Sequence, residues 1–153
     1  MLISTDKLIS EISEAFKGVE LENGIGLSEA DAIDSYSDME FRAQCRQNDE
    51  KFNWNAIPSS ALNKYNCGLY FFDAKGMRFH LPAFMIANIN GEYIFDMVFI
   101  LTHLSDYSKS QFELLSKKQR EAITLFLQQL LEEPNYDFEK PQITRAIEDY
   151  WTK

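Results

Sequence analysis

Apolar residues recur at helical spacing in the first third of the chain. In residues 6–16 they fall three and four positions apart, and Gly18 follows as a natural helix stop. Ser28 and Ser37 are each followed three residues later by an acid, a pattern typical of helix N-termini. We therefore predict a helix over residues 6–16, and one bent helix or two short ones over residues 28–48.

The last third shows the same periodicity more strongly. Ser116 and Gln119 form a capping-box sequence, and apolar residues then repeat every three or four positions until Pro134. Pro141 is placed to open a further helix, because proline is favoured in the first turn. The chain is thus predicted to end in two helices.

The middle of the chain has the pattern of a β-hairpin. Aromatic-rich runs flank residues 73–76, Asp-Ala-Lys-Gly, where glycine could adopt the positive φ that closes such a turn. Residues 68–81 are therefore predicted to form two antiparallel strands, which Pro82 would end because it has no N–H to donate. The dipeptide Asn-Gly at 90–91 then predicts a tight turn before a third strand over residues 92–101.

Together these elements predict one α+β domain over residues 1–153. It would contain N-terminal helices, a small three-stranded antiparallel sheet, and two C-terminal helices packed over one face of that sheet. With 153 residues, 45% of them hydrophobic and 14% aromatic, the chain can bury a core of its own.

The charge of the chain is concentrated in its first third. The formal net charge is −9, of which −8 falls in residues 1–50 and −1 in residues 51–153. Such a charge disfavours polyphosphate backbones and anionic membrane surfaces, so neither nucleic acid nor a membrane is an expected partner. A basic protein is the partner that the charge favours, although a merely solvated acidic surface would give the same composition.

The sequence shows no sign of export or of a bound cofactor. The N-terminus lacks a basic segment followed by a long apolar run, and no stretch has the length of a membrane span. We therefore expect a cytoplasmic protein. Because the two cysteines match no metal-ligand or redox spacing and no phosphate-binding glycine pattern is complete, we expect neither a metal nor a cofactor.

Seven segments in this order resemble a family of small bacterial domains of unknown function. The most specific of them is FFDAKGMRFHLP, and the resemblance spans nearly the whole chain. The segments are Gly26–Ala30, Ile33–Tyr36, Trp54–Pro58, Phe71–Pro82, Leu101–His103, Leu115–Arg120 and Tyr150–Trp151. The resemblance implies a single compact bacterial domain and supplies no activity, cofactor or catalytic residue.

Only a few side chains could perform chemistry. If the sheet brings the two histidines close to a carboxylate, a His/carboxylate pair could act as a general base or hold a metal. A histidine hydrogen-bonded to the backbone is the alternative. An arginine among apolar residues could form an ion pair that pins the hairpin, or bind an anionic ligand. The resulting candidate polar cluster is Asp49, Asp73, Arg78, His80 and His103.

Two functional hypotheses from different classes follow, beside a scaffold role without catalysis. The first is a non-catalytic acidic domain that binds a basic protein, in its most specific form an immunity-type inhibitor of a basic toxin. Its candidate protein-binding residues are Glu29, Asp31, Asp34, Asp38 and Glu40. The alternative is a small-ligand-binding or metal-binding enzyme that uses Arg78, His80 and His103 in a shared polar pocket.

Overall fold

The computed structural model describes residues 3–153, and within this range every regular element is a helix. The predicted α+β class is therefore wrong, and no sheet lies between the N-terminal and C-terminal helices of this range. The α-helices are α1 (Thr5–Ala15), α2 (Leu27–Asp34), α3 (Met39–Asn48), α4 (Ser59–Lys64), α5 (Ala74–Ile89), α6 (Val98–Thr102), α7 (Asp106–Gln111), α8 (Lys117–Leu131) and α9 (Lys140–Ala146).

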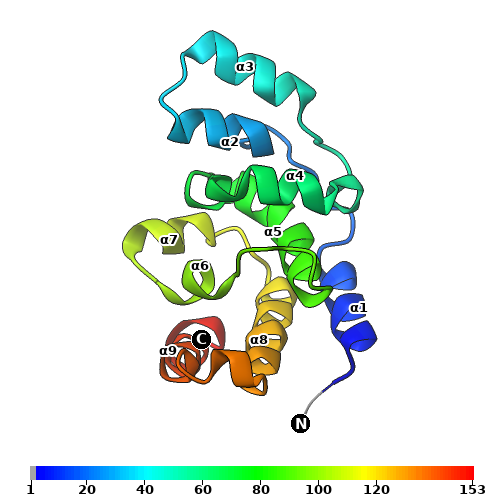
Figure 1. Cartoon of the computed structure of the whole chain (residues 1–153), viewed down its shortest axis with the longest axis vertical. Helices are drawn as coiled ribbons and strands as arrows, with labels where there is room; N and C mark the ends of the chain where they lie inside the picture. Colours follow the sequence, from blue (N-terminus) through cyan, green and yellow to red (C-terminus); the bar gives the residue numbers. More distant parts are fainter. Residues whose placement is uncertain (1–2) are drawn as a thin grey trace.

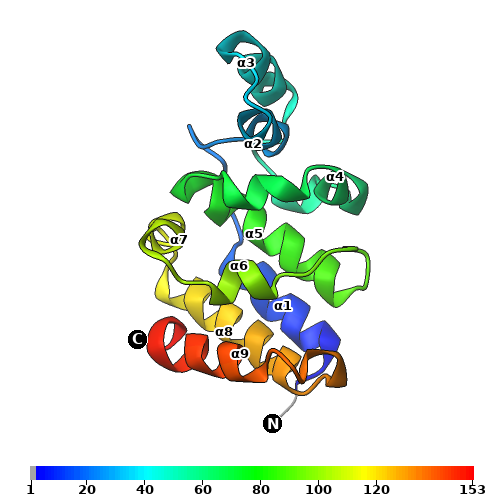
Figure 2. The same cartoon turned by 60° about the vertical axis from the view of Figure 1, so that its left-hand side comes forward.

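Short helical turns complete the fold. The 3₁₀ turns are η1 (Trp54–Ala56), η2 (Asn66–Tyr70) and η3 (Pro134–Tyr136), and a π-helical turn, η4 (Ile147–Trp151), continues α9. Along the longest axis, α1, α8 and α9 lie at one end, α5 crosses the middle, and α2 and α3 lie at the other end (Figures 1 and 2).

The prediction of a hairpin over residues 68–81 is wrong. These residues form the end of η2, a short connection and the first half of the buried helix α5. Asp73 caps this helix, because its Oδ1 accepts the Gly76 N–H at 2.9 Å. The residues predicted as a β-turn are thus a helix N-terminus. Ten of the sixteen residues of α5 are buried, among them Pro82, so the helix has no continuous polar face that would reveal its period.

The predicted third strand is also wrong. Asn90 ends α5, and Gly91 follows with φ of 73°, so this dipeptide does form a turn. The chain then passes through an irregular segment into α6. Tyr93 and Met97 of this segment and Leu101 of α6 are buried, which means that packing against the other helices, not strand pairing, holds this part of the chain in place.

The predicted helices at both ends of the chain are confirmed. Residues 28–48 form two short helices, α2 and α3, and the capping box at the start of α8 is present. There the Ser116 Oγ accepts the Gln119 N–H at 3.1 Å, and the Gln119 Oε1 accepts the Ser116 N–H at 2.9 Å. The predicted starts of α2 and α3 are displaced, since Gly26 and Asp38 are the residues that precede them.

One hydrophobic cluster joins α1, α5, α6, α8 and α9. Its largest fully buried side chains are Phe16, Phe72, Phe79, Phe84, Phe112 and Phe126. The C-terminal turn is attached to it, because the buried Trp151 donates its Nε1–H to the Leu101 carbonyl at 2.9 Å. Within residues 3–153, no helix combines the length and apolar character needed to cross a bilayer.

Candidate functional site on the α2–α3 arm

Residues 27–48, which we call the arm, form an antiparallel pair of helices at one end of the molecule (Figures 1 and 2). The inner helix, α2, packs on η2, where Gly68 lets the backbone approach Ala30: a Cβ on Gly68 would lie 3.1 Å from the Ala30 Cβ. The outer helix, α3, has α2 as its principal packing partner, and all ten of its residues retain some solvent exposure. The outer helix of the arm therefore projects from the core, whereas Leu27 and Ala30 of the inner helix belong to it.

Asp49, at the end of α3, caps the start of α2. Its Oδ1 accepts from the N–H and the Oγ–H of Ser28 at 3.0 and 2.7 Å, and its Oδ2 accepts the Glu29 N–H at 3.1 Å. Gly26 precedes α2 and lies directly against this carboxylate, so a side chain at that position would overlap Asp49. A negative charge at a helix N-terminus is favourable because the free N–H groups there carry partial positive charge.

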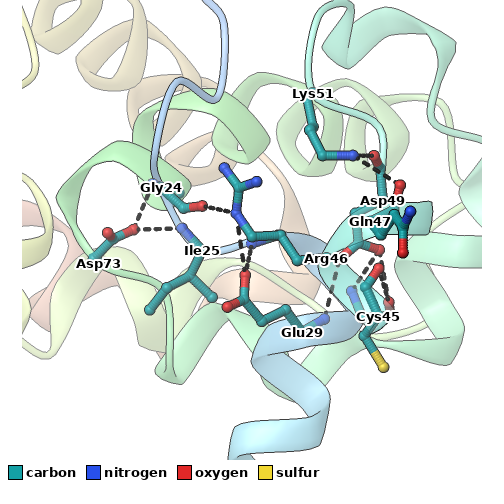
Figure 3. Close-up of polar contacts among 12 residues, drawn as sticks. Gly24, Ile25, Glu29, Cys45, Arg46, Gln47, Asp49, Lys51 and Asp73 are labelled. Carbon is teal, nitrogen blue, oxygen red and sulfur yellow. Dashed lines mark hydrogen bonds and ion pairs between the residues drawn. The ribbon is translucent and has the colours of Figure 1, made fainter. Parts of the chain in front are cut away.

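A second carboxylate, Asp73, joins the arm to α5. Besides capping α5, its Oδ1 accepts the Ile25 N–H at 3.0 Å, in the segment that leads into α2 (Figure 3). The approach is close, since a Cβ on Gly76 would lie 2.6 Å from the Ile25 carbonyl oxygen. The segment before the arm is thus fixed to the most deeply buried helix.

Arg46 of α3 closes the same region from the other side. Its Nε donates to the Gly24 carbonyl at 3.0 Å (Figure 3). Its Nη2 donates to the Glu22 carbonyl at 2.7 Å. Glu29 lies 3.7 Å from the Arg46 Nε and accepts the Gly26 N–H at 2.8 Å. Glu29 is therefore engaged within the arm and is a poor candidate for contacting a partner.

The other four predicted binding acids remain available. Asp31 and Asp34 are half-exposed on α2, and Asp38 and Glu40 are exposed where α3 begins. Asp38 caps α3 by accepting the Phe41 N–H at 2.8 Å. Among residues 3–153, no ion pair involves any of these four carboxylates.

Large apolar side chains lie among these acids on the surface. The exposed fractions are 93% for Tyr36, 82% for Met39 and 50% for Phe41. All three fall within six residues at the turn between α2 and α3. We call Asp34, Tyr36, Asp38, Met39, Glu40 and Phe41 the tip of the arm.

The residues of the candidate polar cluster do not form one site, and each has a different structural role. The predicted ion pair of Arg78 exists, but its partner is Glu22, at 3.0 Å, and not Asp49 or Asp73. Lys75 lies 3.3 Å from the same Glu22 carboxylate. These residues attach the segment before the arm to α5, and within residues 3–153 no group of three or more His, Cys, Asp or Glu side chains is placed to hold a metal.

The two histidines occupy different environments. His80 is completely buried, stacked on Phe72 with ring centroids 4.3 Å apart, and its Nδ1 donates to the Gly76 carbonyl at 2.7 Å. Burial lowers the pKa of its imidazole to about 4, and the nearby Gly76 carbonyl and the charges of Asp49 and Asp73 only partly offset this. His103 is exposed and stacks on Phe99. A fully buried His80 cannot line an open pocket with His103.

Sequence reasoning found the acids of the arm but missed Glu22 and the apolar residues of the tip. A signal for the latter was present. Tyr36 lies between the cap residues Ser35 and Asp38, and Met39 and Phe41 lie in the first turn of α3, a helix without a buried residue. Apolar residues at such positions share no buried helical stripe. Glu22 had no such signal, because its partners lie more than fifty residues away.

The structure thus defines an all-helical domain with a firmly attached acidic arm whose tip is partly apolar. A family model described as a family of unknown function (DUF6714) matches residues 4–153. The chain belongs to this family, which confirms membership of a family without assigned function. Comparison with curated proteins and with solved structures found no match.

Proposed function

We propose that this protein is a non-catalytic binding domain whose arm docks onto a cationic protein surface. The observation that carries the proposal is the coincidence, on one projection, of four acids without an internal ion pair and three exposed apolar side chains. Apolar side chains at the centre of an interface supply most of the affinity, and surrounding charges supply orientation and specificity.

Charge at the arm supports a basic partner. Residues 27–48 contain five acids and two arginines, a net charge of −3, and both arginines donate to backbone carbonyls of the same chain. The carboxylates therefore dominate the outward field of the arm. An acidic surface of this kind accelerates association with a positively charged protein and disfavours an acidic one.

The attachment of the arm also supports docking. Asp49 caps α2, and Asp73 fixes the segment before it to α5, so the two helices are held in one arrangement. A surface that is already ordered loses less conformational entropy on binding than a flexible one.

The specific form of the proposal is an immunity-type inhibitor of a basic toxin. A toxin that acts on a polyanion needs a cationic cleft, and an acidic projection inserted into such a cleft would exclude the polyanion.

The experiment neutralises the four acids of the arm that form no ion pair within residues 3–153. The arm variant carries Asp31→Asn, Asp34→Asn, Asp38→Asn and Glu40→Gln; asparagine still caps a helix, so α3 keeps its start. Glu29 and Asp49 are left unchanged because they hold the arm together. The matched control removes four exposed acids elsewhere with Glu113→Gln, Glu121→Gln, Glu132→Gln and Glu148→Gln.

Proteins that bind the immobilised wild-type chain in a lysate of its own host are identified, purified and tested against both variants. We expect a partner with a net positive charge whose affinity falls by about tenfold or more for the arm variant, mainly through slower association. The control variant should bind within about threefold of the wild type. Equal weakening by both variants, or none by the arm variant, would contradict the proposal.

A further inference from the structure

The aromatic residue at the end of α2 stands in a backbone conformation that suits glycine. Tyr36 has a φ of 59°, in the left-handed region, and follows Ser35, the C-cap residue of the helix. The Tyr36 N–H donates to the Ile33 carbonyl at 3.1 Å and the Ser37 N–H to the Ala32 carbonyl at 3.0 Å. These two bonds define the Schellman ending, in which glycine or asparagine is the favoured residue at this position.

The tyrosine side chain makes no packing contact in the described chain that would offset the free-energy cost of this backbone conformation. The ring is 93% exposed, so it buries almost no apolar surface in the folded protein. A tyrosine at a left-handed position is uncommon, and its backbone cost is borne without a gain in internal packing. The ring extends into solvent, and Met39 and Phe41, three and five residues further along the chain, are also exposed.

We infer that Tyr36 is the anchor of the docking surface, and that it packs against lysine or arginine side chains of the partner. This inference rests on the proposed function and names the residue that would supply most of its affinity. Tyrosine is among the residues enriched at the centres of interfaces, because it offers a large rigid surface and a hydroxyl.

The neighbours of Tyr36 favour a cationic occupant over a purely apolar one. Asp34, Asp38 and Glu40 all lie within four residues of it along the chain. A lysine or arginine of the partner could place its charge over the ring and donate to one of these carboxylates in the same pose. The acids would make insertion of an uncharged apolar segment unfavourable, since their charges would lose water without gaining a partner.

Two substitutions distinguish the contribution of the Tyr36 ring to binding from the effect of its backbone strain on stability. Tyr36→Gly removes the ring and relieves the left-handed strain, so we expect the midpoint of thermal unfolding to rise by about 2–4 °C. Tyr36→Ala removes the ring but keeps the strain, so its midpoint should stay within about 1 °C of the wild type. Both should weaken binding of the purified partner by about thirtyfold, which corresponds to about 2 kcal/mol.

Site-specific photocrosslinking identifies the contact directly. The full chain carries p-benzoylphenylalanine at position 36 or, as the matched control, at position 138, because Phe138 is also 93% exposed. We expect an adduct from position 36, and not from position 138, with a protein of net positive charge. Equal adducts from both positions would overturn both the anchor and the proposed function.

The remaining outcomes distinguish the two. If both Tyr36 variants keep the wild-type affinity while the arm variant loses it, Tyr36 is not the anchor and the proposed function stands. If the Tyr36 variants lose affinity but the arm variant does not, Tyr36 contacts the partner, but the charge-based proposal and the lysine or arginine contact both fail. A fall in the unfolding midpoint of Tyr36→Gly would contradict the strain on which the inference relies.

Discussion

The side chain of His80 shows how burial changes what a residue can do. Its imidazole is enclosed by Phe72 and Phe79, whose ring centroids lie 4.3 and 4.9 Å away. One ring nitrogen donates to Gly76, and the other has no hydrogen-bond partner among residues 3–153. Because such a site disfavours the charged form, this histidine serves the packing of α5 and not proton transfer near neutral pH.

The stability of the fold should therefore depend on pH through His80. The pKa falls from an ordinary value of 6.5 to about 4 on folding, so between these values the unfolded chain takes up a proton that the folded chain does not. Stability should then decrease as the pH falls through this window, by roughly 3 kcal/mol at its lower end. The measurement is urea unfolding between pH 7 and 4.

Comparison of variants isolates this contribution from that of the carboxylates. For His80→Phe, which keeps an aromatic ring against Phe72, the loss of stability on acidification should be smaller than in the wild type. His103→Gln, which replaces the exposed histidine, is the matched control. Identical curves for His80→Phe and the wild type would show that His80 titrates normally.

At the scale of elements, the arm depends on caps supplied from outside its own helices. The helix α2 has only eight residues, and isolated helices of this length are unstable in water. Asp49 accepts hydrogen bonds from Ser28 and Glu29 in its first turn, and Asp73 holds Ile25 just before it. The carboxylates predicted as candidates for chemistry thus stabilise a helix start.

Removal of this cap should loosen the arm while leaving the core folded. For Asp49→Ala we expect a loss of about 1–2 kcal/mol and faster amide hydrogen exchange at residues 28–30. Exchange in α5 and α8 should change much less, because their packing does not involve this carboxylate. Asp149→Ala, which removes an exposed acid in η4, is the matched control. Uniform acceleration across the chain would contradict a local role for Asp49.

On the scale of the whole molecule, the acidic first third is divided between two ends. The helix α1 lies with α8 and α9, whereas the arm lies at the opposite end of the long axis (Figures 1 and 2). The charge of −8 in residues 1–50 is therefore not a single patch. The part that belongs to the arm is −3 for residues 27–48, with Asp49 and Glu50 immediately following.

A partner that binds the arm should associate more slowly as salt is added. With opposite charges on the two surfaces, the association rate constant should fall by about tenfold between 20 and 500 mM salt, while the dissociation rate changes little. Stopped-flow measurement with the purified partner tests this. The slope should be much reduced for the arm variant and kept by the variant that neutralises Glu113, Glu121, Glu132 and Glu148. A salt-independent rate would argue against steering by the arm.

The sequence by itself determined those elements that have one buried and one exposed face. The helices α1, α8 and α9 have apolar residues at helical spacing on one face and polar residues on the other, so these helices could be predicted. The capping box of Ser116 and Gln119 could also be predicted, because it is a local sequence pattern. The acidity of residues 27–48 was equally readable, because net charge is a property of composition.

Only the tertiary structure decided the conformation of the middle of the chain and the contacts that attach the arm to α5. α5 is buried around most of its circumference, so its residues show no period, and surrounding helices select a helix where local turn chemistry favoured a hairpin. Asp49, Asp73 and Glu22 each have a hydrogen-bond partner that lies 20 to 56 residues away in the chain. No local pattern encodes such distances, because they are set by how the helices pack.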